Sequence, residues 1–279
     1  NGCNKYERRA IGLINIFPDT IIIPVLTILG AAIGSFLNVV IYRVPLKMSI
    51  VRPSSHCFSC KKTINIKDNI PILGYFLLGG KCRHCKEPFP SRYAFVELIT
   101  AVLTICIYLI FGMGQTFVMY LALTYLLIAI TFVDIDHFII PNGFVLIGIF
   151  MLIFGIYTGW IPIEWEDAMS GSFVFAGFLF AIGLIGQFIL RKESIGFGDV
   201  KLGLVLGGYL GTEYSILALY LSFAISAIII FIMMGGNLIR KDSKIPFGPY
   251  LAAGTLIALF TTTPYGGNYI LNWYYTTMF

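Results

Sequence analysis

The sequence predicts an all-α polytopic membrane protein with about eight transmembrane helices and a cytoplasmic zinc-binding module between the first two. Composition is the first observation behind this prediction: 58% of the 279 residues are hydrophobic and 12% are charged, far from the balance of soluble globular domains. The second observation is the distribution of polar residues. They gather in one long segment, and the remaining chain alternates apolar stretches with short loops.

Eight apolar stretches approach the length of about 20 residues that a bilayer-spanning helix needs. They lie near residues 21–42, 94–112, 115–133, 138–160, 168–190, 200–211, 215–235 and 247–263. The stretch at 200–211 is shorter than the others and rich in glycine. The chain is therefore expected to divide into an N-terminal segment with the first helix (1–42), a cytoplasmic zinc module (43–93) and a seven-helix membrane body (94–279).

The first apolar stretch has glycines four residues apart, Gly30 and Gly34, with Asn38 one turn further on. Small residues at this spacing let a neighbouring helix approach closely, and an asparagine can hydrogen-bond across such a contact. We therefore expect the first helix to pack tightly against another helix.

Basic residues predict the orientation of the helices. If the spans alternate and the N-terminus lies outside, the inside loops contain 16 of the 19 Lys and Arg residues, as the positive-inside rule requires. The net charge of +5 then reflects orientation and attraction to anionic headgroups, and no nucleic-acid partner is expected. Lys5, Arg8 and Arg9 are exceptions; without an initiating Met, we expect a fragmentary or processed start and no cleavable signal peptide.

Four cysteines form two CxxC pairs, Cys57/Cys60 and Cys82/Cys85, separated by 21 residues. Two such pairs can supply four thiolates in the tetrahedral arrangement that zinc favours. Two disulfides are the alternative, but they rarely persist in the reducing cytoplasm where this loop is predicted to lie. Because four thiolates leave no open coordination position, we expect the zinc to be structural.

Two acidic clusters lie at the ends of apolar stretches on the same predicted side of the membrane. One has Asp134 and Asp136, followed by His137, and the other has Asp199. If Asp134 and Asp199 meet across the helices, one carboxyl group can keep a proton while the other activates water, as in aspartic peptidases. The chemistry alone does not choose between Asp134 and Asp136.

Each acidic residue also has a simpler interpretation. Asp199 can cap the N-terminus of a helix, and Asp136 can be an interfacial carboxylate in contact with water. Gly196 and Gly198 favour a functional role for Asp199, since residues without side chains let a substrate backbone approach. We therefore predict that Asp199 forms a catalytic pair with an aspartate of the other cluster, Asp134 or Asp136.

Ordered motifs give the chain a resemblance to the type IV prepilin peptidases. In sequence order they are Gly34-Ser35-Phe36-Leu37-Asn38-Val39-Val40, Tyr42-Arg43-Val44-Pro45, the two cysteine pairs around Asn69-Ile70-Pro71 and Gly79-Gly80-Lys81, Arg92-Tyr93, Glu97, Val133-Asp134-Ile135-Asp136-His137, the GFGDVKLG segment at 196–203, and Ile245-Pro246-Phe247-Gly248-Pro249-Tyr250. The resemblance covers nearly the whole chain from the first helix onward. The chain departs from the common pattern at Pro141-Asn142 and around Phe197.

The resemblance implies a bifunctional enzyme of the bacterial inner membrane. Such enzymes remove the leader from type IV prepilins or type II secretion pseudopilins, cutting after a glycine, and then N-methylate the new N-terminal residue, usually phenylalanine, from S-adenosylmethionine. By resemblance, the catalytic residues are Asp134 and Asp199 and the zinc ligands are the four cysteines. Candidates for binding substrate or cofactor are Gly196, Gly198, Asn38 and Arg43. No recognisable nucleotide-binding loop locates the S-adenosylmethionine site, and the segment from Gly34 to Pro45 and the zinc module are the places to look.

Four alternative functions remain open. The first is a peptidase that does not methylate, and the second is a zinc-stabilised transporter that uses the aspartates as a proton or cation site. The other two are a presenilin-like peptidase and a non-catalytic assembly factor. The transporter predicts acids spread through the membrane depth, whereas these acids gather at one face. The presenilin-like pattern pairs a tyrosine with its first aspartate, and Val133 stands in that place here.

Overall fold

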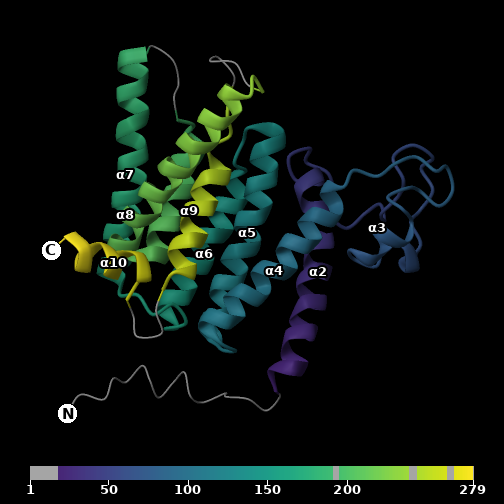
Figure 1. Ribbon diagram of the computed structural model, residues 1–279, viewed down its shortest axis with the longest axis horizontal. Helices are drawn as coiled ribbons and strands as arrows, with labels where there is room; N and C mark the ends of the chain where they lie inside the picture. Colours follow the sequence, from purple (N-terminus) through teal and green to yellow (C-terminus); the bar gives the residue numbers. More distant parts are fainter. Residues whose placement is uncertain (1–17, 191–194, 239–243, 263–266, 279) are drawn as a thin grey trace. The chain divides into compact units, whose positions relative to one another are not determined.

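The computed structural model describes residues 18–190, 195–238, 244–262 and 267–278, and within these ranges the protein is helical, with isolated β-bridges and no strands. Figure 1 shows the helices in chain order. The described chain forms two compact units, one ending at Leu121 and the other beginning at Ala122. The prediction of an all-helical protein is confirmed.

The first unit contains two long helices, the cysteine segment between them and the first part of α5. Its elements are α2 (Asp19–Arg43), η2 (Ile66–Asp68), α3 (Leu73–Leu77) and α4 (Arg92–Phe111). Helices α2 and α4 are antiparallel neighbours: the Tyr108 hydroxyl near the end of α4 donates to Asp19 Oδ1 (2.6 Å), and Asn38 Nδ2 near the end of α2 donates to the Tyr93 carbonyl (3.1 Å).

Glycines bring the backbones of α2 and α4 together. A Cβ atom added to Gly34 would lie 2.7 Å from the Cα atom of Glu97, and one added to Gly30 would lie 2.8 Å from the Cα atom of Ala101. Real Cβ atoms do not approach backbone so closely, so only glycine fits at both positions. The predicted tight packing of the first helix, including the hydrogen bond from Asn38, is confirmed.

The second unit contains the remaining helices. They are the rest of α5 (Gln115–His137), α6 (Asn142–Tyr157), α7 (Trp165–Leu190), α8 (Phe197–Gly235), α9 (Gly248–Phe260) and α10 (Tyr269–Met278). Helix α8 packs against α6, α7 and α9. Small residues again allow close approach: a Cβ atom on Gly207 would collide with the backbone of Gly171 in α7.

Helix α8 has a sharp kink at Gly211, whose φ of 70° and ψ of −179° are not helical. Ser215 Oγ donates to the carbonyl of Gly207 at 3.4 Å, although residues eight apart in a straight helix are separated by about 12 Å. The backbone N–H of Thr212 donates to Asp167 Oδ1 in the first turn of α7 (2.9 Å). The two helical arms on either side of Gly211 correspond to the predicted stretches at 200–211 and 215–235.

Five helices in the described ranges are long and apolar enough to cross a membrane: α2, α4, α5, α7 and α8. Helices α6 and α9 are also apolar but have 16 and 13 residues, so they extend about 24 and 20 Å against a hydrocarbon core of about 30 Å. A multi-pass helical membrane protein is therefore confirmed, with five spans by length and composition.

Candidate active site

The second unit buries two carboxyl groups near helix ends. Asp134, in the last turn of α5, is 5% exposed, and Asp199, in the first turn of α8, is 8% exposed, whereas Asp136 and His137 are exposed. Residues two apart point in different directions from a helix, so α5 cannot turn Asp134 and Asp136 to the same side. The structure brings Asp134 into the interior with Asp199 and leaves Asp136 outside.

The backbone of Gly248 contacts the Asp134 carboxylate. The Gly248 N–H, at the start of α9, donates to Asp134 Oδ2 at 2.9 Å. A helix N-terminus has unpaired N–H groups and a partial positive charge, which suit a carboxylate. A Cβ atom at Gly248 would lie 2.8 Å from the same oxygen, so the contact requires glycine. Our sequence analysis did not identify this residue as functional; the signal available was a glycine followed by Pro249 at the start of an apolar stretch.

The Asp199 carboxylate closes the first turn of its own helix. The Gly196 N–H donates to Asp199 Oδ2 (3.2 Å), and this carboxylate interacts electrostatically with that of Asp134. A Cβ atom on Gly198 would lie 3.2 Å from Cβ of Ile140, just beyond the end of α5. The end of α5 and the beginnings of α8 and α9 thus converge on the two carboxyl groups.

A lysine connects α8 to the start of α6. Lys201 Nζ donates to Asn142 Oδ1 (3.0 Å) and lies 4.9 Å from the centre of the Phe197 ring. Asn142 is one of the positions where the chain departs from the common prepilin-peptidase pattern. The uncharged amide accepts a hydrogen bond from the lysine and so joins the start of α6 to a residue near the start of α8.

In the first unit, the four predicted metal ligands form one cluster. The sulfur atoms of Cys57, Cys60, Cys82 and Cys85 all lie within 4.8 Å of one another, and all four thiols are free. The Sγ–Sγ distances are 3.7 Å for Cys57–Cys85 and 4.0 Å for Cys60–Cys82. A zinc ion with Zn–S bonds of about 2.3 Å needs tetrahedral edges of about 3.8 Å. The donor set therefore fits tetrahedral zinc, and these separations exceed a disulfide bond of about 2.05 Å.

Backbone N–H groups favour the thiolate form in both CxxC turns. The N–H of Cys60 lowers the pKa of the Cys57 thiol to about 6, and the N–H of Cys85 lowers the pKa of Cys82. The N–H of Glu87 lowers the pKa of the Cys85 thiol, but burial and the neighbouring thiols outweigh this effect and raise that pKa to about 11. A cation is needed before all four sulfurs can carry negative charge together.

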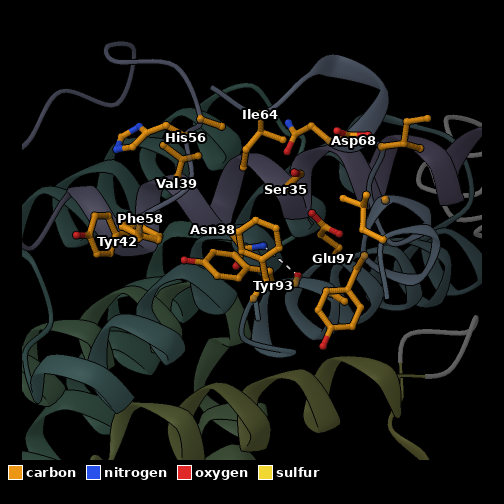
Figure 2. Close-up of a pocket in the computed structure, with 18 of the residues that line it drawn as sticks. Ser35, Asn38, Val39, Tyr42, His56, Phe58, Ile64, Asp68, Tyr93 and Glu97 are labelled. Atoms are coloured by element: carbon orange, nitrogen blue, oxygen red, sulfur yellow. Dashed lines mark hydrogen bonds between the residues drawn. The ribbon is translucent and has the colours of Figure 1, made fainter. Parts of the chain in front are cut away.

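Beside the cysteine cluster lies a cavity of about 310 Å³, which we call the α2–α4 cavity. Figure 2 shows side chains from α2, α4 and the cysteine segment around it. Its lining includes five aromatic rings, two carboxylates and two basic residues: Tyr42, Phe58, Tyr75, Phe89, Tyr93, Asp68, Glu97, Arg43 and Lys61.

Two of the predicted binding candidates line this cavity and also hold its walls. Arg43, 7% exposed, donates from Nη1 to the Ser49 carbonyl (2.9 Å) and from Nη2 to the Pro53 carbonyl (2.7 Å), which fastens the following loop to α2. Asn38 fastens α2 to Tyr93, as Figure 2 shows. The other two candidates, Gly196 and Gly198, lie in the second unit next to Asp199.

Comparison with known proteins identifies two family models. Residues 28–111 match the bacterial peptidase A24 N-terminal domain, and residues 121–232 match the type IV leader peptidase family. The first match covers the C-terminal two thirds of α2, the cysteine cluster and α4, and the second covers both buried aspartates.

Curated relatives match along most of their length. A prepilin leader peptidase/N-methyltransferase of Aeromonas hydrophila is 34% identical over 274 residues, covering 88% of this chain and 90% of the relative. The protein of the same name from Pseudomonas aeruginosa is 33% identical, covering 83% and 88%. A type 4 prepilin-like proteins leader peptide-processing enzyme of Escherichia coli is 33% identical, covering 85% and 93%. No solved structure matches the chain.

Proposed function

The chain belongs to the type IV leader peptidase family, and on this premise we propose that it removes leaders from type IV prepilins or type II secretion pseudopilins and then N-methylates the new N-terminus. The observation that carries the peptidase assignment is the burial of two carboxyl groups, Asp134 and Asp199, where three helix ends converge. Burying an acid costs free energy, so two acids buried together at helix ends indicate a functional site.

The two aspartates act as a general base and a general acid. The ionised carboxylate takes a proton from water, and the water oxygen bonds to the carbonyl carbon of the glycine that ends the leader. The protonated carboxyl group donates its proton to the carbonyl oxygen. When the tetrahedral intermediate collapses, the C–N bond breaks and a proton passes to the departing nitrogen. The products are a leader ending in a carboxylate and a mature protein with a free amine.

The methylation step uses that amine. S-adenosylmethionine supplies a methyl group bound to a positively charged sulfur. The amine lone pair forms the new N–C bond, the S–C bond breaks with its electrons left on sulfur, and a proton is released to solvent. Support for this half of the function comes from the relatives named N-methyltransferase.

Zinc has a structural role in this proposal. Cys57, Cys60, Cys82 and Cys85 hold it and thereby fasten the two CxxC turns to each other, and four thiolates leave no position for substrate. The ion therefore takes no part in either reaction.

We place the zinc module and both aspartates at the cytoplasmic face of the bacterial inner membrane. The basic loops support this orientation by the positive-inside rule. In this arrangement the chain crosses the bilayer eight times, with the two arms of α8 as separate spans and α6 and α9 as short ones. In this proposal the prepilin substrate also lies in the bilayer.

The test is cleavage of a membrane-embedded prepilin by the purified full chain. Asp134→Asn and Asp199→Asn should each lower the cleavage rate by at least about 100-fold, because each removes a proton-transfer group. Asp136→Asn is the matched control and should cleave at close to the wild-type rate. Normal cleavage by either folded Asp134→Asn or Asp199→Asn would refute the catalytic pair.

Mass spectrometry of the mature product tests the second activity in the same reaction. With S-adenosylmethionine present, the N-terminal residue should gain one methyl group. A product with an unmethylated amine would show that the protein is a peptidase that does not methylate.

A further inference from the structure

We propose that the α2–α4 cavity binds S-adenosylmethionine and that Glu97 faces its positively charged sulfonium; this inference rests on the methyltransferase half of the proposed function. The cavity, of about 310 Å³, is within the range of small-molecule sites, about 300–1,000 Å³. It lies entirely in the first unit, so it is separate from the carboxyl pair at Asp134 and Asp199.

Glu97 is a buried acid that has no basic partner among the described residues. It is 8% exposed, and its hydrogen bonds come from the backbone N–H of Ile72 (2.6 Å to Oε2) and the side chain of Ser35. The other acid of the cavity, Asp68, already pairs with Arg83, which donates from Nε at 2.8 Å. A buried carboxylate is costly unless a positive charge compensates it, and a cationic ligand can supply that charge.

Aromatic rings lie around the same space. Tyr42 and Phe58 pack edge to face with ring centres 5.2 Å apart, and Figure 2 shows them beside each other, with Tyr93 next to Asn38. Aromatic faces stack on an adenine ring and attract a cation such as a sulfonium. S-adenosylmethionine has both groups, so the aromatic lining suits its adenine ring and its central sulfonium.

Basic groups in the lining suit the remaining part of the ligand. Arg43 and Lys61 line the cavity, and S-adenosylmethionine has one carboxylate in addition to its sulfonium and its ammonium. A lining with one uncompensated acid and two bases thus has both signs of charge that an amino acid ligand requires.

A strained turn lies between Ile70 and Gly74, two residues that line the cavity. Ile72 has φ 63° and ψ −58°, and the Leu73 N–H donates to the Pro71 carbonyl at 2.6 Å, which together define a γ-turn with positive φ. This turn is rare and strained, above all for a β-branched residue, and persists only where its surroundings hold it. Glu97 holds it by accepting the Ile72 N–H. The same carboxylate therefore fixes the segment between two lining residues and supplies a negative charge to the cavity.

The test is equilibrium binding of radiolabelled S-adenosylmethionine and S-adenosylhomocysteine to the full chain in lipid nanodiscs. Glu97→Gln keeps an acceptor for the Ile72 N–H but removes the charge. Because S-adenosylhomocysteine has a neutral sulfur, the variant should raise the Kd of S-adenosylmethionine by about ten-fold or more and change that of S-adenosylhomocysteine much less. Glu166→Gln, which removes an exposed acid of the second unit, is the matched control and should bind both ligands like wild type.

The outcomes separate this inference from the proposed function. If wild type binds S-adenosylmethionine and Glu97→Gln binds it equally well, or loses both ligands in the same proportion, the assigned role of Glu97 is wrong and methylation still stands. If wild type cleaves leaders but neither binds nor uses S-adenosylmethionine, the methyltransferase half of the function fails as well.

A measurement on the wild-type chain covers the case in which Glu97→Gln does not fold. Ultraviolet irradiation with methyl-labelled S-adenosylmethionine should attach label to peptides that contain Tyr42, Phe58 or Tyr93. Label confined to residues 122–279 would overturn the location.

Discussion

The contact between Gly248 and Asp134 makes Gly248→Ala a sharp test of how the peptidase site is held. The added methyl group would lie 2.8 Å from Asp134 Oδ2 and 3.3 Å from its Cγ, so the carboxyl group must retreat by about 0.6 Å to reach an ordinary 3.4 Å contact. The hydrogen bond from the Gly248 N–H, now 2.9 Å, would lengthen beyond the useful range.

The size of the effect follows from that lost hydrogen bond. A hydrogen bond to a charged group contributes about 1.5–3 kcal/mol, and each 1.4 kcal/mol corresponds to a ten-fold change in rate. If the bond acts fully in the transition state, Gly248→Ala should lower kcat/KM for leader cleavage by about 10- to 100-fold. The assay is cleavage of a prepilin by the reconstituted full chain over a range of substrate concentrations.

Gly177→Ala is the matched control, because a methyl group at Gly177 in α7 meets nothing within 4 Å. It should cleave at close to the wild-type rate. If Gly248→Ala folds and cleaves like wild type, the carboxylate does not depend on the start of α9, and the reasoning is refuted.

Three further predictions concern the first unit. Cys82→Ser should lower the zinc content measured by elemental analysis and the thermal stability of the protein, whereas Cys106→Ser should keep its zinc; retained zinc in Cys82→Ser would argue against the four-thiolate site. Lowering the pH should also weaken zinc binding, because protons compete with the metal for the four sulfur atoms. Gly34→Ala should destabilise the protein by about 1–3 kcal/mol in denaturant unfolding, since its Cβ would lie 2.7 Å from the backbone of Glu97. Gly143→Ala, which meets nothing within 4 Å, should change little, and equal stability of the two variants would contradict the close packing of α2 on α4.

Much of this protein follows from its sequence because the governing physics is local. A backbone in lipid must satisfy its own hydrogen bonds, so each long apolar stretch becomes a helix, and its position can be predicted to within a few residues. The glycine spacing of Gly30 and Gly34 predicted a close helix contact for a similar reason. The CxxC spacing predicted the cysteine cluster, since each turn brings its two sulfurs together whatever surrounds it.

Only the tertiary structure decided which side chains of the proposed peptidase site meet. The side-chain chemistry does not distinguish Asp134 from Asp136, and the packing of α5 against its neighbours determines which of them is buried. Gly248 lies 114 residues along the chain from Asp134, whose carboxylate it contacts, and no local sequence pattern predicts a contact between them. The strained turn at Ile72 likewise depends on a contact between distant residues, the hydrogen bond from the Ile72 N–H to Glu97 in α4. Such contacts join segments remote in the chain, so they are consequences of packing, which a single sequence does not encode locally.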